Sequence, residues 1–369
     1  MDLAALSKVH GDFYAPAFSV RVGGGDLIQR YNIGVTQAEA DLSLGAAGRF
    51  TFTVVNAYSI EKHAFVTGSG RDLFEVLTFG AEVEIRMGYG DLAETERIIT
   101  GIVTEMTTSF PDQGTPELSI AGYDHGFLMT TGKNTRSWKQ RRDSEAVLEI
   151  AGFHNLTPDI EPTKEQHPQI EQSQESDFEF LKKLAERNHY EFYVRDRTLR
   201  FGKPRDKGDG QVKLQWGAGL ISFRPQANLA GQIAGVEVHG WDPKQKKPIV
   251  GKALAGDESG RDTGRNSAGD RLKTIAKDAN RQPLLRIRQP VFTQAEADSR
   301  AKAALSERAK QFLTAEGESI GLPEIRPDMN VTLDNLGTPF SKTYYVQQTT
   351  HRVDGSGYRT KFKVKETTL

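Results

Sequence analysis

Hydrophobic and polar residues alternate along much of the first third of the chain. Phe18, Val20 and Val22 are separated by polar residues, and a period of two places such side chains on one face of a half-buried strand. The same alternation recurs in RFTFTVVN (49–56), EVEIRM (82–87), RIITGIVTEMTTSF (97–110) and ELSIAGYD (117–124). Short strands separated by glycine-rich turns predict a tube-like antiparallel β-barrel over residues 1–125.

The hydrophobic period changes near residue 126. The segment DSEAVLEIAGFHN (143–155) predicts a short helix closed by Gly152, and ESDFEFLKKLAERN (175–188) predicts a second helix. The following YEFYV, RDR and TLRF read as strand, turn and strand. Helices that alternate with strands predict a middle α+β domain over residues 126–204.

Strand patterns return after Pro204 and predict a second tube-like β-barrel over residues 205–369. Residues 251–280 are polar and glycine-rich, which predicts a long surface loop inserted in this barrel. From Thr293 to Leu313 the pattern is helical again, and its stripe of alanines suits close packing on a sheet. The expected fold class is therefore mainly β with α+β, with two barrels and a middle domain.

Two helix starts carry a capping signal. Ser176 is followed three residues later by Glu179, and Thr293 by Glu296; in such a capping box each side chain satisfies a backbone donor that the helix start leaves open. Leu181 falls on the apolar face of the first of these helices. These five residues are predicted to be structural.

Four acids fall within residues 175–186, so a catalytic acid cluster is the alternative to a capped helix. The capping box, together with the favourable placement of Asp177 in the first turn, explains the acids without any chemistry. We therefore predict no catalytic, cofactor-binding or metal-binding residue here. The eight histidines also show no spacing of a local metal site.

Both ends of the chain show a similar order of strands. A strand at Val83 is followed by a threonine-rich strand, a short polar turn and a third strand, and the same succession starts at Val331. An internal repeat accounts for this similarity, and so does generic β patterning.

Charge and composition narrow the possible functions. The chain has 48 Lys and Arg against 49 Asp and Glu, so no overall charge attracts nucleic acid or an acidic membrane. It has no cysteine, which excludes disulfides and thiolate chemistry, and we expect neither Sec-type export nor membrane insertion. Two basic runs, RSWKQRR (136–142) and PKQKKP (243–248), read as solvated loop charge; the alternative is contact with nucleic acid or an acidic partner, with Trp138 as a stacking platform.

The ordered segments EVEIRMGYG, RIITGIVTEMTTSFPDQGTPELSIAGYD, DSEAVLEIAG and QSQESDFEFLKKLAERNHYEFYV resemble the baseplate hub proteins of contractile phage tails and injection systems. In particular, they resemble the late control gene D family and the hub half of type VI secretion spikes. The block from Thr293 to Val353 resembles the second barrel of the same family, so the resemblance spans nearly the whole chain.

This resemblance implies a structural, non-enzymatic hub. Three subunits of a homotrimer, each with two barrels, would form a ring of pseudo-sixfold symmetry that joins the sixfold tail tube to the threefold spike. The implied partners are the inner tail tube protein, a spike or needle protein and baseplate wedge proteins, and DNA or an effector protein would pass through the lumen. Assembly in the bacterial cytoplasm into a phage virion or a tail-like injection particle is expected.

The chain differs from the resembled family in one respect, and a second hypothesis for its function competes with the hub. The chain ends at Leu369 directly after its last strand, so the spike is either a separate polypeptide or was removed. The competing hypothesis is a tail-associated glycoside hydrolase that acts on cell-wall glycan, because two suitably spaced carboxylates need no recognisable local motif.

Overall fold

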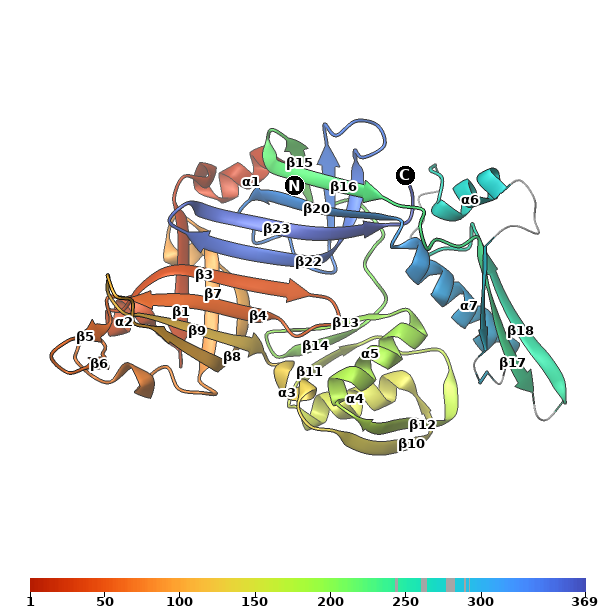
Figure 1. The fold of residues 1–369 in the computed structure, drawn as a ribbon, viewed down its shortest axis with the longest axis horizontal. Coiled ribbons are helices and arrows are strands. Elements are labelled where there is room, and N and C mark those ends of the chain that lie inside the picture. The colour runs from red at the N-terminus through yellow and green to blue at the C-terminus, as the bar shows by residue number, and fades with distance from the viewer. Residues whose placement is uncertain (243–244, 260–263, 277–282, 289, 292) are drawn as a thin grey trace.

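The computed structural model describes residues 1–369 except 243–244, 260–263, 277–282, 289 and 292. Figure 1 shows a mainly β fold in which long strands form one continuous curved layer, with a helix-containing segment below it and a projecting β-hairpin to one side. The predicted fold class is confirmed.

The first barrel-like unit is a curved antiparallel sheet. Its strands are β1 (Pro16–Val22), β2 (Gly25–Asp26), β3 (Gly34–Ser43), β4 (Arg49–Val55), β7 (Glu82–Tyr89), β8 (Glu96–Ser109) and β9 (Glu117–Asp124). They lie in the order β2-β1-β7-β8-β9-β4-β3. The alternation in the sequence correctly marks the inner face, since Phe50, Phe52 and Val54 are at most 1 % exposed. Among the described strands no pairing joins β1 to β3, so this sheet is not closed by hydrogen bonds.

The second unit is a closed barrel. Its strands are β15 (Val212–Trp216), β16 (Gly219–Ala227), β20 (Leu313–Ile320), β21 (Asn330–Asp334), β22 (Lys342–Asp354) and β23 (Gly357–Glu366). The pairings run β22-β21-β15-β16-β20-β23 and return from β23 to β22. Inside it, Phe362 and Val364 are buried, while Lys361 and Lys363 point outward, as the sequence pattern predicts.

The two units repeat the same arrangement of strands. If β3, β4, β7, β8 and β9 are equated in turn with β16, β20, β21, β22 and β23, every antiparallel pairing among the first five has its counterpart among the second five. Two of the register irregularities also coincide. The β8–β9 register shifts after Val103 and the β22–β23 register after Val346, while the β3–β4 and β16–β20 registers shift after Val35 and Leu220. Of the two explanations for the similar strand order, the structure therefore supports the internal repeat.

The two units are joined edge to edge by β3 and β22, which pair antiparallel from Ala38 opposite Val353 to Ser43 opposite Gln348. This pairing makes one 13-stranded sheet of both units. The predicted domain boundaries at residues 125 and 204 stay predictions. Strand pairing joins the first predicted domain to the third, while the described strands of the middle one pair only among themselves.

The middle segment forms its own hydrophobic core. Its elements are α3 (Phe127–Thr130), β10 (Asn134–Arg142), α4 (Asp143–Phe153), β11 (Thr157–Ile160), β12 (Gln166–Glu175), α5 (Asp177–Asn188), β13 (Glu191–Arg195) and β14 (Thr198–Gly202). The predicted β13–β14 hairpin is confirmed. The prediction that Gly152 closes the first helix is wrong, since α4 continues through Phe153 and His154 caps it. A glycine inside a helix costs only about 1 kcal/mol, which packing on one face offsets.

Leu181 tests the core of the middle segment. It is fully buried in a cluster with Trp138, Ile150 and Phe201. We expect Leu181→Ala to lower the free energy of unfolding by about 3 kcal/mol, because the lost apolar contacts leave a cavity that close packing does not refill. Urea denaturation measures this change. Exposed Leu148 on α4 gives the matched control, since Leu148→Ala should change the value by less than about 0.5 kcal/mol; equal effects of the two variants would place Leu181 outside the core.

A small α/β unit projects from the second barrel. It consists of β17 (Gly235–Asp242), β18 (Lys247–Leu254), β19 (Leu284–Arg288) and α7 (Gln294–Ala309). As the alanine stripe predicts, α7 packs on this sheet through buried Ala297 and Ala301. The approach is so close that a Cβ added at Gly251 would collide with the backbone of Ala297. Only glycine fits at this position.

The predicted loop insertion at 251–280 is wrong in part. Strand β18 continues to Leu254, and α6 (Ala268–Ala276) forms a helix with Ala268 buried in the second core. Alternating apolar residues in β18 are covered by α7, a contact that the local sequence does not reveal. Residues 260–263 and 277–280 of this prediction lie outside the described residues.

The sequence pattern does not predict several short elements. They are α1 (Leu3–Val9), α2 (Leu27–Tyr31), β5 (Tyr58–Ser59) and β6 (Ala64–Phe65). In α1, Leu6 is fully buried in the core of the second barrel, beside Val212 and Leu214. The N-terminal helix thus covers the barrel that lies at the far end of the sequence.

Candidate functional site

The predicted cap of α5 has the geometry of a capping box. The Ser176 hydroxyl oxygen accepts a hydrogen bond from the Glu179 backbone N–H (3.1 Å), and Glu179 Oε2 accepts from the Ser176 N–H (2.9 Å). These bonds use the local backbone donors of the helix start. Ser176 and Glu179 do not line the cavity described below.

Removal of this cap should weaken α5. We expect Ser176→Ala to lower the free energy of unfolding by about 1 kcal/mol, because the Glu179 N–H loses its acceptor. Chemical denaturation gives the value, and Ser176→Asp, which retains an acceptor at the N-cap, should recover most of it. An alanine variant as stable as the parent would show that this hydrogen bond does not hold the helix start.

The start of α7 is capped by Thr293, whose Oγ1 accepts from the Glu296 N–H (3.1 Å). The Glu296 carboxylate lies 2.7 Å from Arg300, one turn further along the helix. Glu296 is 7 % exposed and also lies at the wall of the largest cavity. Glu296 therefore has a structural role and also lies beside this cavity.

Asp177, which the sequence pattern predicts only as a helix-start acid, is a buried hydrogen-bonding centre. Its side chain is 3 % exposed. One oxygen accepts from Arg136 (2.6 Å), Gln172 (2.7 Å) and Asn134 (3.0 Å), and the other lies 2.8 Å from His154. Burial by itself raises the pKa of Asp177, but the hydrogen bonds from His154, Gln172 and Arg136 outweigh it and lower the pKa. The carboxylate is held ionised.

Asp143 occupies the equivalent position at the start of α4. It is fully buried and accepts from Arg187 Nε (2.8 Å) and Asn188 Nδ2 (2.6 Å), with His167 3.6 Å away. Burial raises the pKa of Asp143, and the hydrogen bonds from His167 and Arg187 more than compensate, so the net shift is downward.

The two aspartates form a reciprocal clasp between α4 and α5. Asp143 at the start of α4 binds Arg187 and Asn188 at the end of α5, while Asp177 at the start of α5 binds His154 at the end of α4. An anion at a helix start and a cation near a helix end both complement the helix dipole, as Asp143, Asp177 and Arg187 do. The two helix-start aspartates therefore serve the packing of the middle segment. A sequence signal existed, because each helix begins with Asp and is followed by a C-cap His, and α5 has Arg187 in its last turn.

The first basic run is a strand, so its interpretation as a loop is wrong. In β10, Trp138 is 6 % exposed, stacks on Phe180 with ring centroids 5.3 Å apart, and donates from Nε1 to Glu149 (3.0 Å). Its ring faces are therefore not available for stacking on bases.

The second basic run lies at the turn between β17 and β18. Its first two residues, at positions 243 and 244, lie outside the described residues. Gln245 and Lys246 form the turn, and Lys247 and Pro248 begin β18. These four residues are exposed, as the interpretation as solvated charge requires.

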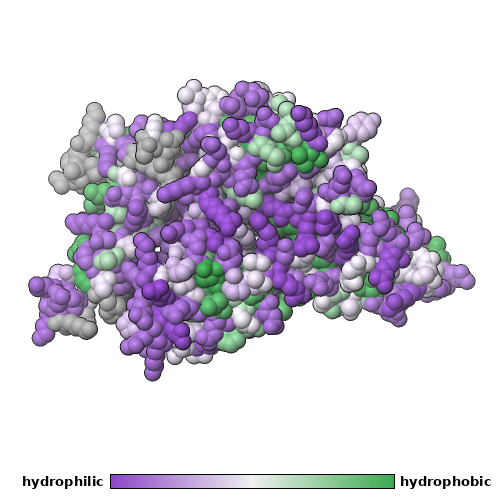
Figure 2. All heavy atoms as spheres, turned by 180° about the vertical axis from the view of Figure 1, so that it is seen from behind, coloured by the Kyte–Doolittle hydropathy of each residue, from purple (hydrophilic) through white to green (hydrophobic). Residues whose placement is uncertain are grey.

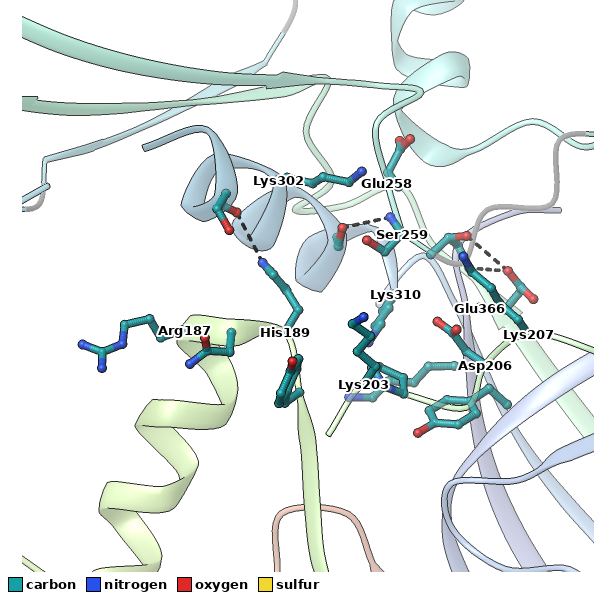
Figure 3. Close-up of a pocket in the computed structure, with 18 of the residues that line it drawn as sticks. Arg187, His189, Lys203, Asp206, Lys207, Glu258, Ser259, Lys302, Lys310 and Glu366 are labelled. Atoms are coloured by element: carbon teal, nitrogen blue, oxygen red, sulfur yellow. Dashed lines mark hydrogen bonds between the residues drawn. The ribbon is translucent and has the colours of Figure 1, made fainter. Parts of the chain in front are cut away.

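The largest cavity, of about 1200 Å³, lies between the middle segment, α7 and the second barrel. Figure 3 shows Lys203, Lys207 and Lys310 on its walls, with Asp206 between them and Lys302 on α7.

Polar groups at the edges of this cavity join two neighbouring segments to α7. The His189 ring lies 3.3 Å from the Ser299 carbonyl oxygen, which joins the end of α5 to α7. The Ser259 N–H donates to Ser306 Oγ (3.0 Å), which joins the segment after β18 to the same helix.

Burial shifts several charged groups around this cavity toward their neutral forms. It lowers the pKa of His189 and raises the pKa of Asp206, and it raises the pKa of Glu191, whose carboxylate lies 3.7 Å from Lys310. The cavity can hold anionic groups at its lysines. Within the described part of the chain, no three His, Asp or Glu side chains are grouped to hold a metal ion.

Most of the face opposite to that of Figure 1 is hydrophilic. Apolar side chains form only small separate areas on it (Figure 2). Among the described residues, no helix has the length and hydrophobicity needed to cross a bilayer.

Solved structures share this fold at low sequence identity. The 43 kDa tail protein of prophage MuSo2 from Shewanella oneidensis has a TM-score of 0.69 and 14 % identity, over 95 % of this chain and 98 % of that chain. The tail protein from Neisseria meningitidis MC58 has a TM-score of 0.67 and 14 % identity, over 96 % and 97 % of the two chains. The E. coli c3393 protein, described as a component of the type VI secretion system, has a TM-score of 0.53 and 10 % identity, over 94 % and 76 %.

These similarities show that the chain has the fold of phage tail proteins. No curated protein matches the sequence. A family model described as the Alg8 N-terminal domain matches residues 53–355, which is most of the chain, and the protein belongs to this family.

Proposed function

We propose that the protein is a structural hub in the baseplate of a phage tail or of a related contractile injection system. The observation that carries the proposal is the internal repeat, in which five strands of each unit share their antiparallel pairings and the positions of two register shifts. The fold that the chain shares with tail proteins, and with a component of the type VI secretion system, supports the same conclusion.

The repeat suits a junction between two symmetries. Three copies of a chain with two similar units form a closed ring of six such units. One side of this ring can meet a sixfold tail tube, while the three chains as wholes match a threefold spike. In this proposal the partners are the inner tube protein, the spike or needle protein and the baseplate wedge proteins. DNA or an effector protein passes through the lumen.

The proposed hub belongs to the late control gene D type and has no enzymatic role. Its buried helix-start acids, Asp143 and Asp177, are occupied by arginine, histidine and amide side chains, some of which form the α4–α5 clasp. The proposed assembly takes place in the bacterial cytoplasm, and the product is a virion or a tail-like particle.

Particle mass and imaging test the proposal. Light scattering of the purified protein should give three times the 40.9 kDa mass of one chain. Electron microscopy of the assembled particle should show a threefold ring on the tail axis, between tube and spike. The proposal is contradicted if the purified protein is a monomer and the images show no such ring on the particle axis.

A hydrolase assay tests the competing activity. Asp206 lies in the largest cavity with a pKa raised by burial, as the acid of a glycoside hydrolase requires. We expect the protein to release no reducing sugar from cell-wall glycan. Release that is lost in Asp206→Asn, but retained in a variant of exposed Asp112, would identify an enzyme instead.

A further inference from the structure

The β3–β22 pairing joins the two repeats within one chain. It includes Asp41 opposite Thr350 and Glu39 opposite Arg352. The Thr350 hydroxyl donates to Asp41 (2.5 Å), and Arg352 lies 3.6 Å from Glu39. The alanines on the inner face of this junction, at positions 38 and 40, are fully buried.

Each strand of this junction has a counterpart in the other repeat. Strand β16 corresponds to β3, since both pair with the next strand of their unit and shift register after Leu220 or Val35. Strand β8 corresponds to β22, and equivalent residues form equivalent backbone hydrogen bonds. Val103 bonds to residues 80 and 81, as Val346 bonds to residues 328 and 329.

The two counterpart edges have no strand partner within the described part of the chain. Strand β16 pairs with β15 only through Gly219 and Leu220, so the edge from Ser222 to Ala227 is unpaired on that side. Strand β8 pairs with β7 up to Ile102, which leaves the edge from Glu105 to Ser109 unpaired on the corresponding side. Unpaired strand edges are templates for pairing with another chain.

We propose that the free edge of β16 in one copy pairs antiparallel with the free edge of β8 in the next copy, repeating the β3–β22 junction between subunits. This inference rests on the proposed ring of three chains. The correspondence of the pairings in the two repeats gives the register: Gln226 is placed opposite Thr107 as Asp41 lies opposite Thr350, and Arg224 is placed opposite Ser109.

The placement of the two edges favours a ring over a pair. In Figure 1, β16 lies at the top of the continuous sheet and β8 at the bottom, with β20, β23, β22, β3, β4 and β9 between them. An interface between two different edges is heterologous, and such contacts close into rings when the rotation permits.

The side chains at the edges fit this register. Phe110 is 61 % exposed in the single chain, and the proposed register places it opposite Phe223 on the inner face. The equivalent pair of the internal junction, Val353 opposite Ala38, is buried. Pro225 has no N–H, so one hydrogen bond of the internal junction has no equivalent here. A proline at an edge also restricts pairing with unrelated strands.

Cysteine cross-linking tests the register in the full-length protein, which has no cysteine of its own. Paired residues of adjacent strands have Cα atoms about 4.5–5.5 Å apart, within the range of a disulfide. After mild oxidation, Thr107→Cys/Gln226→Cys should give covalent dimers and trimers on a non-reducing gel. The matched control is Thr107→Cys/Ile221→Cys, because Ile221 lies about 16 Å from Gln226 along the strand at roughly 3.3 Å per residue.

We expect the first variant to exceed the control by about tenfold in covalent product, given the strict geometry of a disulfide. Equal cross-linking of both variants overturns the proposed register. A protein that is trimeric by light scattering but is not cross-linked at Thr107 and Gln226 overturns the interface and leaves the proposed hub function standing. A monomer overturns both.

Discussion

Asp177→Ala should lower the free energy of unfolding by about 3 to 5 kcal/mol, because it leaves buried partners of a carboxylate without their counter-charge. Arg136, Gln172 and His154 all contact this side chain. Without this carboxylate, the Arg136 guanidinium and the Gln172 amide lose hydrogen bonds that water cannot readily replace at a buried position. Helix α5 also loses its contact with His154 at the end of α4. Urea denaturation at neutral pH measures the loss.

Glu186→Ala is the matched control, because it removes an exposed carboxylate from the same helix. Its effect should stay within about 0.5 kcal/mol.

The dependence of stability on pH in the acid range gives a second test. Since the folded pKa of Asp177 is lowered, its contribution is present above the unfolded pKa and is lost as pH falls through the folded pKa. Asp177→Ala should therefore be less sensitive to acid than the parent; the same acid sensitivity in both proteins would show that the ionised carboxylate does not stabilise the fold.

Local features of the fold were accessible from the sequence. The capping box at Ser176 and Glu179 involves residues three apart, so a single helical turn determines it. The inner faces of β4 and β7 follow from a period of two, which any half-buried strand imposes. Both signals are properties of short segments and need no knowledge of distant partners.

Contacts between distant segments were not accessible. The β3–β22 junction joins residues about three hundred positions apart, and the α4–α5 clasp depends on how two helices pack. The sequence predicts a loop at the end of β18, because the helix that packs on this strand, α7, lies more than forty residues away in the sequence. The sequence accounts for Asp177 as a helix-start acid, but its partners, Arg136 and His154, emerge only from the tertiary structure.

Asp124 gives the second large expected effect, a loss of stability as pH rises from about 4 to about 7. It is 4 % exposed at the end of β9 and accepts hydrogen bonds from the backbone N–H groups of Gly48 (2.6 Å) and Gly126 (2.8 Å). Burial raises its pKa from 3.8 to about 7, against the opposing effect of these two donors. Between these values the folded chain retains a proton that the unfolded chain releases.

The sign follows from this difference. Because the unfolded state binds fewer protons, the free energy of unfolding falls with rising pH, by up to about 4 kcal/mol at roughly 1.4 kcal/mol per unit of pKa. Asp124→Asn removes the titration, so its stability between about pH 4 and about pH 7 should decline less than that of the parent, whatever its absolute value. Asp112→Asn, at an exposed turn, should follow the parent. If denaturation curves of Asp124→Asn and the parent decline in parallel, the two backbone donors hold Asp124 ionised throughout this range, and the β9 terminus is stabilised by its charge.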